Sequence, residues 1–167
     1  MQVEGGGTGN SYTGPTQVND GNLVLFKSVG VNALGDGSAT NTLTIGDGVG
    51  ADNSAQVIVR NSNQIADGTD VTIDADGLLD LNTFNTSEII GDLAGGGTIT
   101  LGPTSSLTVV SSGSTTYSGS IEGGGTLNKN GVGTLYLDGD SELNVWNINV
   151  NVGRLDVDTD VNNASVL

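Results

Sequence analysis

The sequence predicts an all-β fold, a β-solenoid in which short strands wind into stacked coils. Three observations indicate it: apolar pairs at positions i and i+2 recur along the 167 residues, glycine-rich turns separate them, and no stretch keeps a helical period. Side chains on a strand alternate between its two faces, so each pair places two apolar side chains on one face. A strand this short cannot bury that face alone and needs similar strands above and below it.

The apolar pairs mark the expected strands in chain order. They are Leu23/Leu25, Leu43/Ile45, Val57/Val59, Val71/Ile73, Leu79/Leu81, Ile99/Leu101, Leu107/Val109, Leu135/Leu137, Leu143/Val145, Ile148/Val150 and Leu155/Val157. Turn-forming residues, such as Gly46-Asp47-Gly48 and Asp76-Gly77, lie between the pairs and end the strands. If a coil takes roughly 20 residues, the chain makes about eight coils and a rod of roughly 40 Å.

Two other interpretations fit part of the composition. A hydrophobic fraction of 35% together with 28 glycines suggests disorder, but the apolar residues are patterned and not scattered. A β-sandwich would have longer strands, aromatic core residues and a more even strand spacing. Here the inward set is small and aliphatic, and the spacing between the pairs is uneven, which suits a solenoid whose coils loop outward without disturbing the stack. The sequence therefore favours the solenoid.

The chain is strongly acidic. Its net charge of −15 arises from 19 Asp and Glu residues against four cations, which are Lys27, Arg60, Lys129 and Arg154. Because nucleic acids require a basic footprint, we expect no nucleic-acid partner, and an anionic membrane surface would repel the chain. No apolar run is long enough to span a bilayer, so no membrane insertion by this segment is expected.

The residue types exclude most catalytic chemistry. The chain has no Cys and no His, which removes disulfides, thiolate nucleophiles and the usual general base. Only carboxylates remain as acid, base or nucleophile, and no cation is positioned to perturb a pair of them. Clustered acids do cleave polysaccharides in some β-helix proteins, but the sequence predicts that this chain is not an enzyme.

Two internal repeats support a stack of similar units. Residues 91–99 recur as residues 119–127, both with the run Gly-Gly-Gly-Thr beginning two residues after an apolar residue, Leu93 or Ile121. The spacing of apolar residues and glycine in 16–25 recurs in 148–157. Both ends of the chain therefore resemble cuts through a continuing array.

The chain is expected to be a single β-solenoid segment spanning residues 1–167, cut from a longer repeat array. Its N-terminus lacks the basic and apolar regions of a signal peptide, so an export signal is not expected within it. Residues 1–10 are expected to form a flexible N-terminal tail, with a short strand at Gln2–Glu4. Both terminal coils lack an obvious cap, and we expect open ends that stack.

One motif dominates the second half of the chain. It consists of alternating glycines and leucines around one lysine, at Gly123, Gly125, Leu127, Lys129, Gly131, Gly133, Leu135, Leu137 and Gly139. This motif resembles the autotransporter-associated β-strand repeat of bacterial surface passengers. The second half of that family's pattern is matched near the N-terminus, at Asn10, Tyr12, Gly14, Thr16, Val18, Gly21 and Leu23. The resemblance implies a right-handed parallel β-helix that is secreted or displayed at the outer membrane.

Alternating acids form the only candidate metal sites. Asp156, Asp158 and Asp160 would share one strand face and could hold Ca²⁺ if carbonyl oxygens completed the shell. The simpler interpretation, which we favour, is a solvated outer face. A second set of the same kind is Asp138, Asp140 and Glu142. No cofactor is predicted beyond this weak calcium candidate.

Two further side chains have a functional and a structural interpretation. Trp146 lies among asparagines and could be a stacking platform for a sugar, although a corner residue packed over the coil edge is favoured. Lys129 is the only cation of the glycine–leucine motif, and a surface ion pair is expected for it.

The most direct functional prediction is structural. We expect a stalk or spacer segment of a secreted bacterial surface passenger, which associates through its open ends into homo-oligomers or filaments. The alternative is an adhesin module that binds glycans or matrix along one side of the rod. A carbohydrate-cleaving enzyme comes third.

Overall fold

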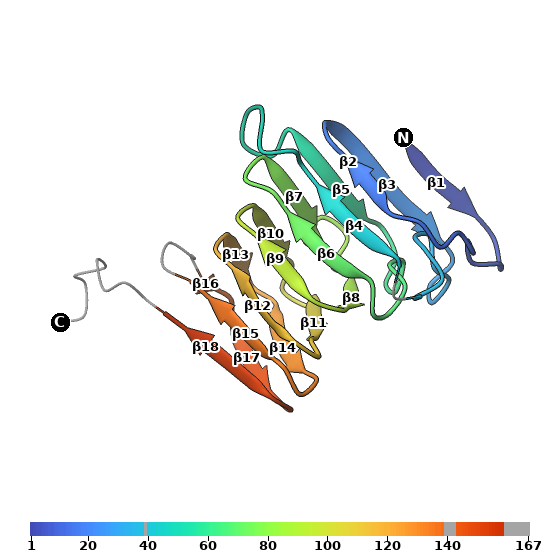
Figure 1. Cartoon of the computed structure of the whole chain (residues 1–167). Helices are drawn as coiled ribbons and strands as arrows, with labels where there is room; N and C mark the ends of the chain where they lie inside the picture. The colour runs from blue at the N-terminus through green and yellow to red at the C-terminus, as the bar shows by residue number, and fades with distance from the viewer. Residues whose placement is uncertain (39, 139–142, 159–167) are drawn as a thin grey trace.

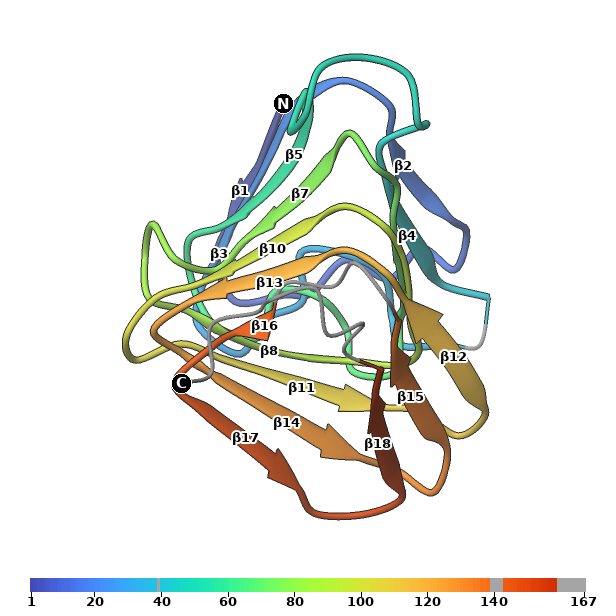
Figure 2. The same cartoon turned by 90° about the vertical axis from the view of Figure 1, so that its left-hand side faces the viewer.

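The chain winds into a right-handed parallel β-helix of about seven coils (Figures 1 and 2). The computed structural model describes residues 1–38, 40–138 and 143–158, and these contain no helix that could cross a membrane. Seen from the C-terminal end, the coils enclose a roughly triangular cross-section with a β-sheet on each side (Figure 2). The predicted fold class is therefore confirmed.

Each coil passes the three sides of the triangle in the same order, but in the coils before β8 the second side is formed by chain without a strand. The first sheet contains β1 (Gln2–Gly5), β3 (Gly21–Lys27), β5 (Ala55–Val59), β7 (Gly77–Asp80), β10 (Thr98–Leu101), β13 (Ser120–Gly123) and β16 (Leu143–Asn144). The second sheet contains β8 (Ser87–Ile90), β11 (Ser106–Val110), β14 (Thr126–Asn130) and β17 (Asn147–Val150). The third sheet contains β2 (Thr16–Val18), β4 (Thr42–Ile45), β6 (Asp70–Ile73), β9 (Leu93–Gly95), β12 (Ser114–Tyr117), β15 (Thr134–Leu137) and β18 (Arg154–Val157).

The coils differ in length, and the expectation of about eight coils is wrong. In the first sheet Leu23 pairs with Val57, Val57 with Leu79 and Leu79 with Ile99. The step from Leu23 to Val57 is much longer than the other two because long loops lengthen that coil. Because of this longer coil, the chain forms about seven coils and not eight.

Inward side chains of each coil stack on those of the next. In the first sheet the column runs through Leu23, Val57, Leu79, Ile99 and Ile121, all of them buried. Burial of each such side chain contributes about 1.5–3 kcal/mol. Since the strands alternate buried and less buried residues, the apolar pairs of the sequence correspond to the inward face.

The third sheet contains one large aromatic residue in its core. Tyr117 is fully buried and pairs with Gly95 of the preceding coil. Its hydroxyl group donates a hydrogen bond of 2.8 Å to the carbonyl oxygen of Gly97. A large ring thus fills the space beneath a residue that has no side chain.

The first internal repeat marks a corner of the triangle. Gly95–Gly97 joins the third sheet to the first, whereas Gly123–Gly125 joins the first sheet to the second. The leading glycine of each run has nearly the same left-handed backbone, with φ of 106° at Gly95 and 105° at Gly123. The repeated unit is therefore a strand–corner–strand element that occurs at different corners.

The second internal repeat follows the same rule. Gly21 turns the chain from the third sheet into the first, and Gly153 turns it from the second sheet into the third. Their φ angles are 75° and 78°, in the left-handed region that favours glycine. The two copies occupy different corners, so the repeat does not mark equivalent points of two coils.

The N-terminal segment joins the first sheet. The short strand expected at Gln2–Glu4 is present as β1, which pairs with β3. The amino group of Met1 donates a hydrogen bond of 2.7 Å to the carbonyl oxygen of Asn22. The flexibility expected for residues 1–10 stays a prediction.

A charge placed in the aliphatic column should unfold the C-terminal coils. Leu135 is fully buried between Thr115 and Leu155 of neighbouring coils, whereas Tyr136 points outward. Leu135→Asp should cost more than about 3 kcal/mol of unfolding free energy, because an unpaired carboxylate would enter the core. Tyr136→Asp is the matched control. Urea unfolding followed by circular dichroism measures both, and equal stabilities would contradict the stacked core.

Candidate functional site

Only part of the predicted acidic metal site lies among the described residues. Asp156 lies on β18 with its carboxylate 2.6 Å from the guanidinium of Arg154, in an exposed ion pair. Asp158 is exposed just after the strand, and Asp160 lies outside the described residues. In the second set, Asp138 is described, whereas Asp140 and Glu142 are not. Calcium binding at either place stays a prediction, and the described residues contain no group of three potential metal ligands.

The glycines of the motif serve close packing between coils. A Cβ atom on Gly133 would lie 1.8 Å from the carbonyl oxygen of Gly113, and one on Gly125 would lie 2.7 Å from the Cβ of Leu101. Gly123 and Gly131 have positive φ angles at corners. Leu127, Leu135 and Leu137 are buried in the core, while Gly139 lies outside the described residues. The described motif residues thus build the coil.

The expected surface ion pair of Lys129 is wrong. Lys129 is fully buried, because it lies two residues after Leu127 on β14 and points inward with it. Its ammonium group donates hydrogen bonds of 2.6 and 3.0 Å to the carbonyl oxygens of Asn130 and Gly131. Burial lowers the pKa of this group below its usual value, and attraction to Asp92 opposes that shift.

A buried carboxylate was not foreseen from the sequence. Glu88 lies on β8, the outermost strand of the second sheet, and is fully buried. Its two oxygens accept hydrogen bonds from the backbone N–H groups of Gln64 (2.8 Å) and Ile65 (3.1 Å). Glu88 therefore binds the irregular chain of the preceding coil where no strand continues the sheet. Burial raises the pKa of Glu88 from 4.5 to about 8 despite these two donors.

Gln64 continues this polar column toward the N-terminus. It is fully buried, and its side-chain oxygen accepts a hydrogen bond of 2.6 Å from the backbone N–H of Lys27. Its amide nitrogen lies 3.3 Å from the carbonyl oxygens of Ser28 and Val31. Over two coils, therefore, side chains of Glu88 and Gln64 make the hydrogen bonds to the backbone that neighbouring strands of the second sheet would otherwise make. The sequence does contain one sign that Glu88 is buried. Glu88 lies two residues before the apolar Ile90, so on a strand both side chains point to the same face.

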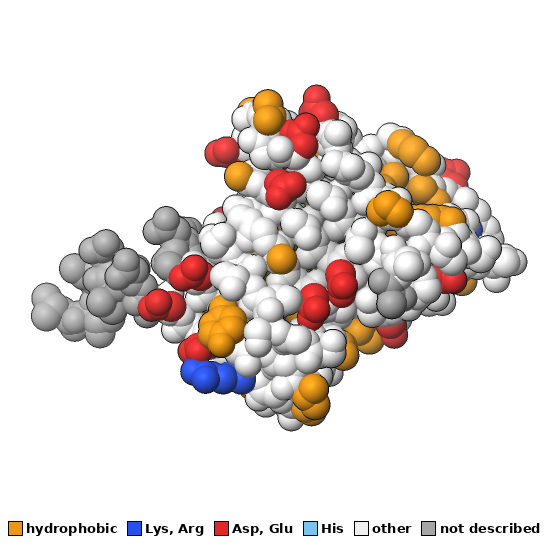
Figure 3. Space-filling view, viewed as in Figure 1, with side chains coloured by type: hydrophobic (Ala, Val, Ile, Leu, Met, Phe, Trp, Pro, Cys, Tyr) orange, Lys and Arg blue, Asp and Glu red, His pale blue; other side chains and the backbone are white. Residues whose placement is uncertain are grey.

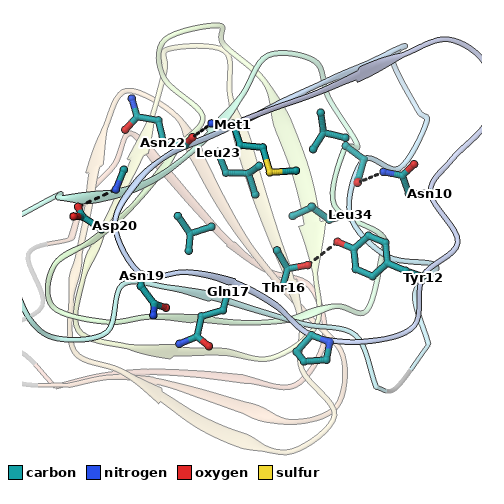
Figure 4. Close-up of a pocket in the computed structure, with 15 residues that line it drawn as sticks. Met1, Asn10, Tyr12, Thr16, Gln17, Asn19, Asp20, Asn22, Leu23 and Leu34 are labelled. Carbon is teal, nitrogen blue, oxygen red and sulfur yellow. Dashed lines mark hydrogen bonds between the residues drawn. The ribbon is translucent and has the colours of Figure 1, made fainter.

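The first coil of the solenoid borders a cavity of about 1000 Å³. Its apolar lining includes Val18, Leu23 and Leu34, of which Figure 4 labels the last two. Polar side chains surround it; Tyr12 and Thr16 form a 2.6 Å hydrogen bond at its rim. The first and third sheets end here at β1 and β2, whose outer edges carry no paired strand.

The last described coil also exposes inward-facing side chains to solvent. Ile148 and Val150 of β17 stack on Leu127 and Lys129 but are 43% and 50% exposed. The three sheets end at β16, β17 and β18 on this side. Among the described residues, therefore, both terminal coils present apolar side chains along the rod axis.

The corner between the first and second sheets carries exposed aromatic rings. The guanidinium carbon of Arg60 lies 4.3 Å from the ring centre of Phe26 and 4.7 Å from that of Phe84, so one cation is enclosed by two rings. Further along the same corner, Trp146 is 70% exposed, and its indole lies against Gly124. Trp146 is thus a corner residue, as favoured, but it remains largely open to solvent.

Comparison of the chain with protein-family models, with curated proteins and with solved structures finds no match.

Two glycines in neighbouring coils provide a test of the packing. Gly133→Ala should destabilise the protein by about 1–3 kcal/mol, because its new methyl group would collide with the backbone of Gly113. Gly113→Ala is the control, since a Cβ there meets no atom within 4 Å. Unfolding free energies in urea measure the difference. A loss at Gly113 as large as that at Gly133 would refute this packing.

Glu88 should make the protein less stable as the pH rises. Between pH 4.5 and about 8 the folded carboxyl group keeps a proton that the unfolded chain has released, so unfolding becomes easier as pH increases. The full effect is on the order of 5 kcal/mol. Glu88→Gln should flatten the pH dependence, although its amide cannot accept both N–H groups and costs stability at every pH.

Urea unfolding at pH 5, 7 and 9 measures this slope. Glu122→Gln, at an outward position of β13, is the control and should keep the slope of the parent protein. An unchanged slope in Glu88→Gln would show that this carboxyl group does not titrate in that range.

Proposed function

We propose that the chain is a structural stalk or spacer segment of a secreted bacterial surface protein, and that it associates end to end. The observation that carries this proposal is that the first and the last described coils both expose apolar side chains along the rod axis. The N-terminal cavity has apolar side chains in its lining, and the last described coil exposes Ile148 and Val150. An apolar end with unpaired strand edges gains both burial and backbone hydrogen bonds when another coil covers it.

The geometry favours contact between unlike ends. All strands of a sheet are parallel, so a second copy that continues the sheets must present its C-terminal coil to the N-terminal coil of the first. Such a heterologous contact does not close on itself and produces filaments. The surface localisation is supported only by the sequence motif of Gly123–Leu137 and stays part of the proposal.

The described interior supports a structural function over catalysis. Two of its buried charged groups are bound to the backbone: Glu88 accepts two N–H groups, and Lys129 donates to two carbonyl oxygens. These contacts stabilise irregular parts of the coil. Neither group opens into the N-terminal cavity, whose lining residues lie in coils closer to the N-terminus.

Charges on the inward face of the last coil should prevent association. The parent chain is expected to show a sedimentation coefficient that rises with concentration, with rods or filaments in electron micrographs. Ile148→Lys combined with Val150→Lys should remain monomeric and folded, because both side chains are already exposed in the single chain. Val132→Lys, at an exposed corner of the preceding coil and outside the inward face, is the control. A parent chain that sediments as a monomer at every concentration would refute end-to-end association.

A further inference from the structure

The corner between the first and second sheets is built from segments without acidic residues, although Asp80 and Glu122 closely precede two of them. The protein as a whole has 19 acidic residues. The corner segments are residues 26–28, 60–63, 82–86, 102–105, 123–126 and 145–147. We call this line of segments the aromatic corner, after Phe26, Phe84 and Trp146. In Figure 2 it is the edge where the chain passes from β7, β10 and β13 to β8, β11 and β14.

The backbone holds the central side chains of the corner in register. The N–H group of Arg60 donates a hydrogen bond of 3.0 Å to the carbonyl oxygen of Leu25, which places Arg60 directly below Phe26. The hydroxyl group of Thr86 donates a hydrogen bond of 3.1 Å to the carbonyl oxygen of Val59. This bond joins the corner segment that contains Phe84 to the one that contains Arg60. The arrangement of Phe26, Arg60 and Phe84 is therefore fixed by the coil.

The charge of Arg60 has no acceptor within the described protein. Its Nε atom is buried without a hydrogen-bond partner, and no ion pair of a described residue includes its guanidinium. The other cations differ: Lys27 donates to the carbonyl oxygen of Thr8, and Arg154 pairs with Asp156. Asp80, which precedes the corner, already accepts hydrogen bonds from Asn82, Thr83 and Thr100.

The two rings limit how a ligand can approach Arg60. Phe26 belongs to the preceding coil and Phe84 to the following one, and both ring centres lie within 4.7 Å of the guanidinium carbon, which leaves the solvent side of the corner for a ligand. A planar carboxylate fits this approach because two oxygens can accept two parallel N–H groups. The edges of aromatic rings carry partial positive charge and favour an anion between them. The site therefore selects a carboxylate over a neutral group.

The remainder of the corner fits the body of a sugar chain. Trp146 offers an open indole face, to which the C–H groups of a sugar ring are attracted. Between the rings lie neutral amides and hydroxyl groups, including Asn82, Asn85 and Thr104, which can donate to and accept from sugar hydroxyls. We propose that the aromatic corner binds an oligosaccharide containing uronic acid, with its carboxylate on Arg60 and its chain along the rod axis.

The test uses an oligomer of galacturonic acid, its neutral galactose counterpart of equal length, and an oligoglutamate peptide. Isothermal titration calorimetry should show binding of the uronic acid oligomer, with at least tenfold weaker binding of the other two. Arg60→Gln should weaken that binding at least tenfold, and Trp146→Ala should weaken it several-fold. Arg154→Gln removes a guanidinium from the third sheet and should bind like the parent chain.

A second variant protects the result against misfolding. Arg60→Lys keeps a cation between the rings but loses the two-pronged donor, so it should fold like the parent and still bind several-fold more weakly. No binding of the uronic acid oligomer, equal binding of oligoglutamate, or an Arg60→Lys affinity equal to that of the parent would each overturn the proposal. Arg60 follows β5 and lies outside both the N-terminal cavity and the last described coil, so the Arg60 variants test sugar binding independently of end-to-end association.

Discussion

Parallel pairing of each strand with its counterpart one coil later is the constraint on which the structure depends. Neighbouring strands lie at ~4.8 Å, so every inward side chain meets the inward side chain of the next coil. Columns such as Leu79, Ile99 and Ile121 form because aliphatic side chains pack well at that distance. At some corners the same spacing leaves no room for a side chain between one coil and the next. For this reason glycine occupies positions 119 and 133, where a Cβ atom would collide with the backbone of the previous coil.

The pairing fails in one region, and buried polar groups take its place. The second sheet ends at β8, while the first and third sheets continue to the N-terminal end. In the missing positions Glu88 and Gln64 provide the hydrogen bonds that a strand would have provided. Buried polar groups are tolerated when their partners are complete, and both side chains meet that condition through backbone contacts. The cost is a carboxyl group whose charge state is coupled to folding.

The ends and the side of the rod have different chemistry. The first and last described coils expose apolar side chains and unpaired strand edges, which suits a partner with the same coil shape. The aromatic corner has a cation and exposed rings but no acidic residue, in a protein with 19 acidic residues, several of which lie on the face shown in Figure 3. A structural rod and a binding surface along it are therefore compatible, because they use different parts of the molecule.

The sequence by itself determined the fold class, since the apolar pairs at i and i+2 and the glycine turns are local patterns, each contained within a few neighbouring residues. It did not reveal which corner a repeat would occupy, because strand–glycine–strand units look alike at all three corners of the triangle. Only the tertiary structure placed Arg60 between Phe26 and Phe84, residues that are distant in the chain and belong to successive coils. The tertiary structure also decided the burial of Lys129 and Glu88, because charge alone predicts exposure, whereas the strand register turned both inward.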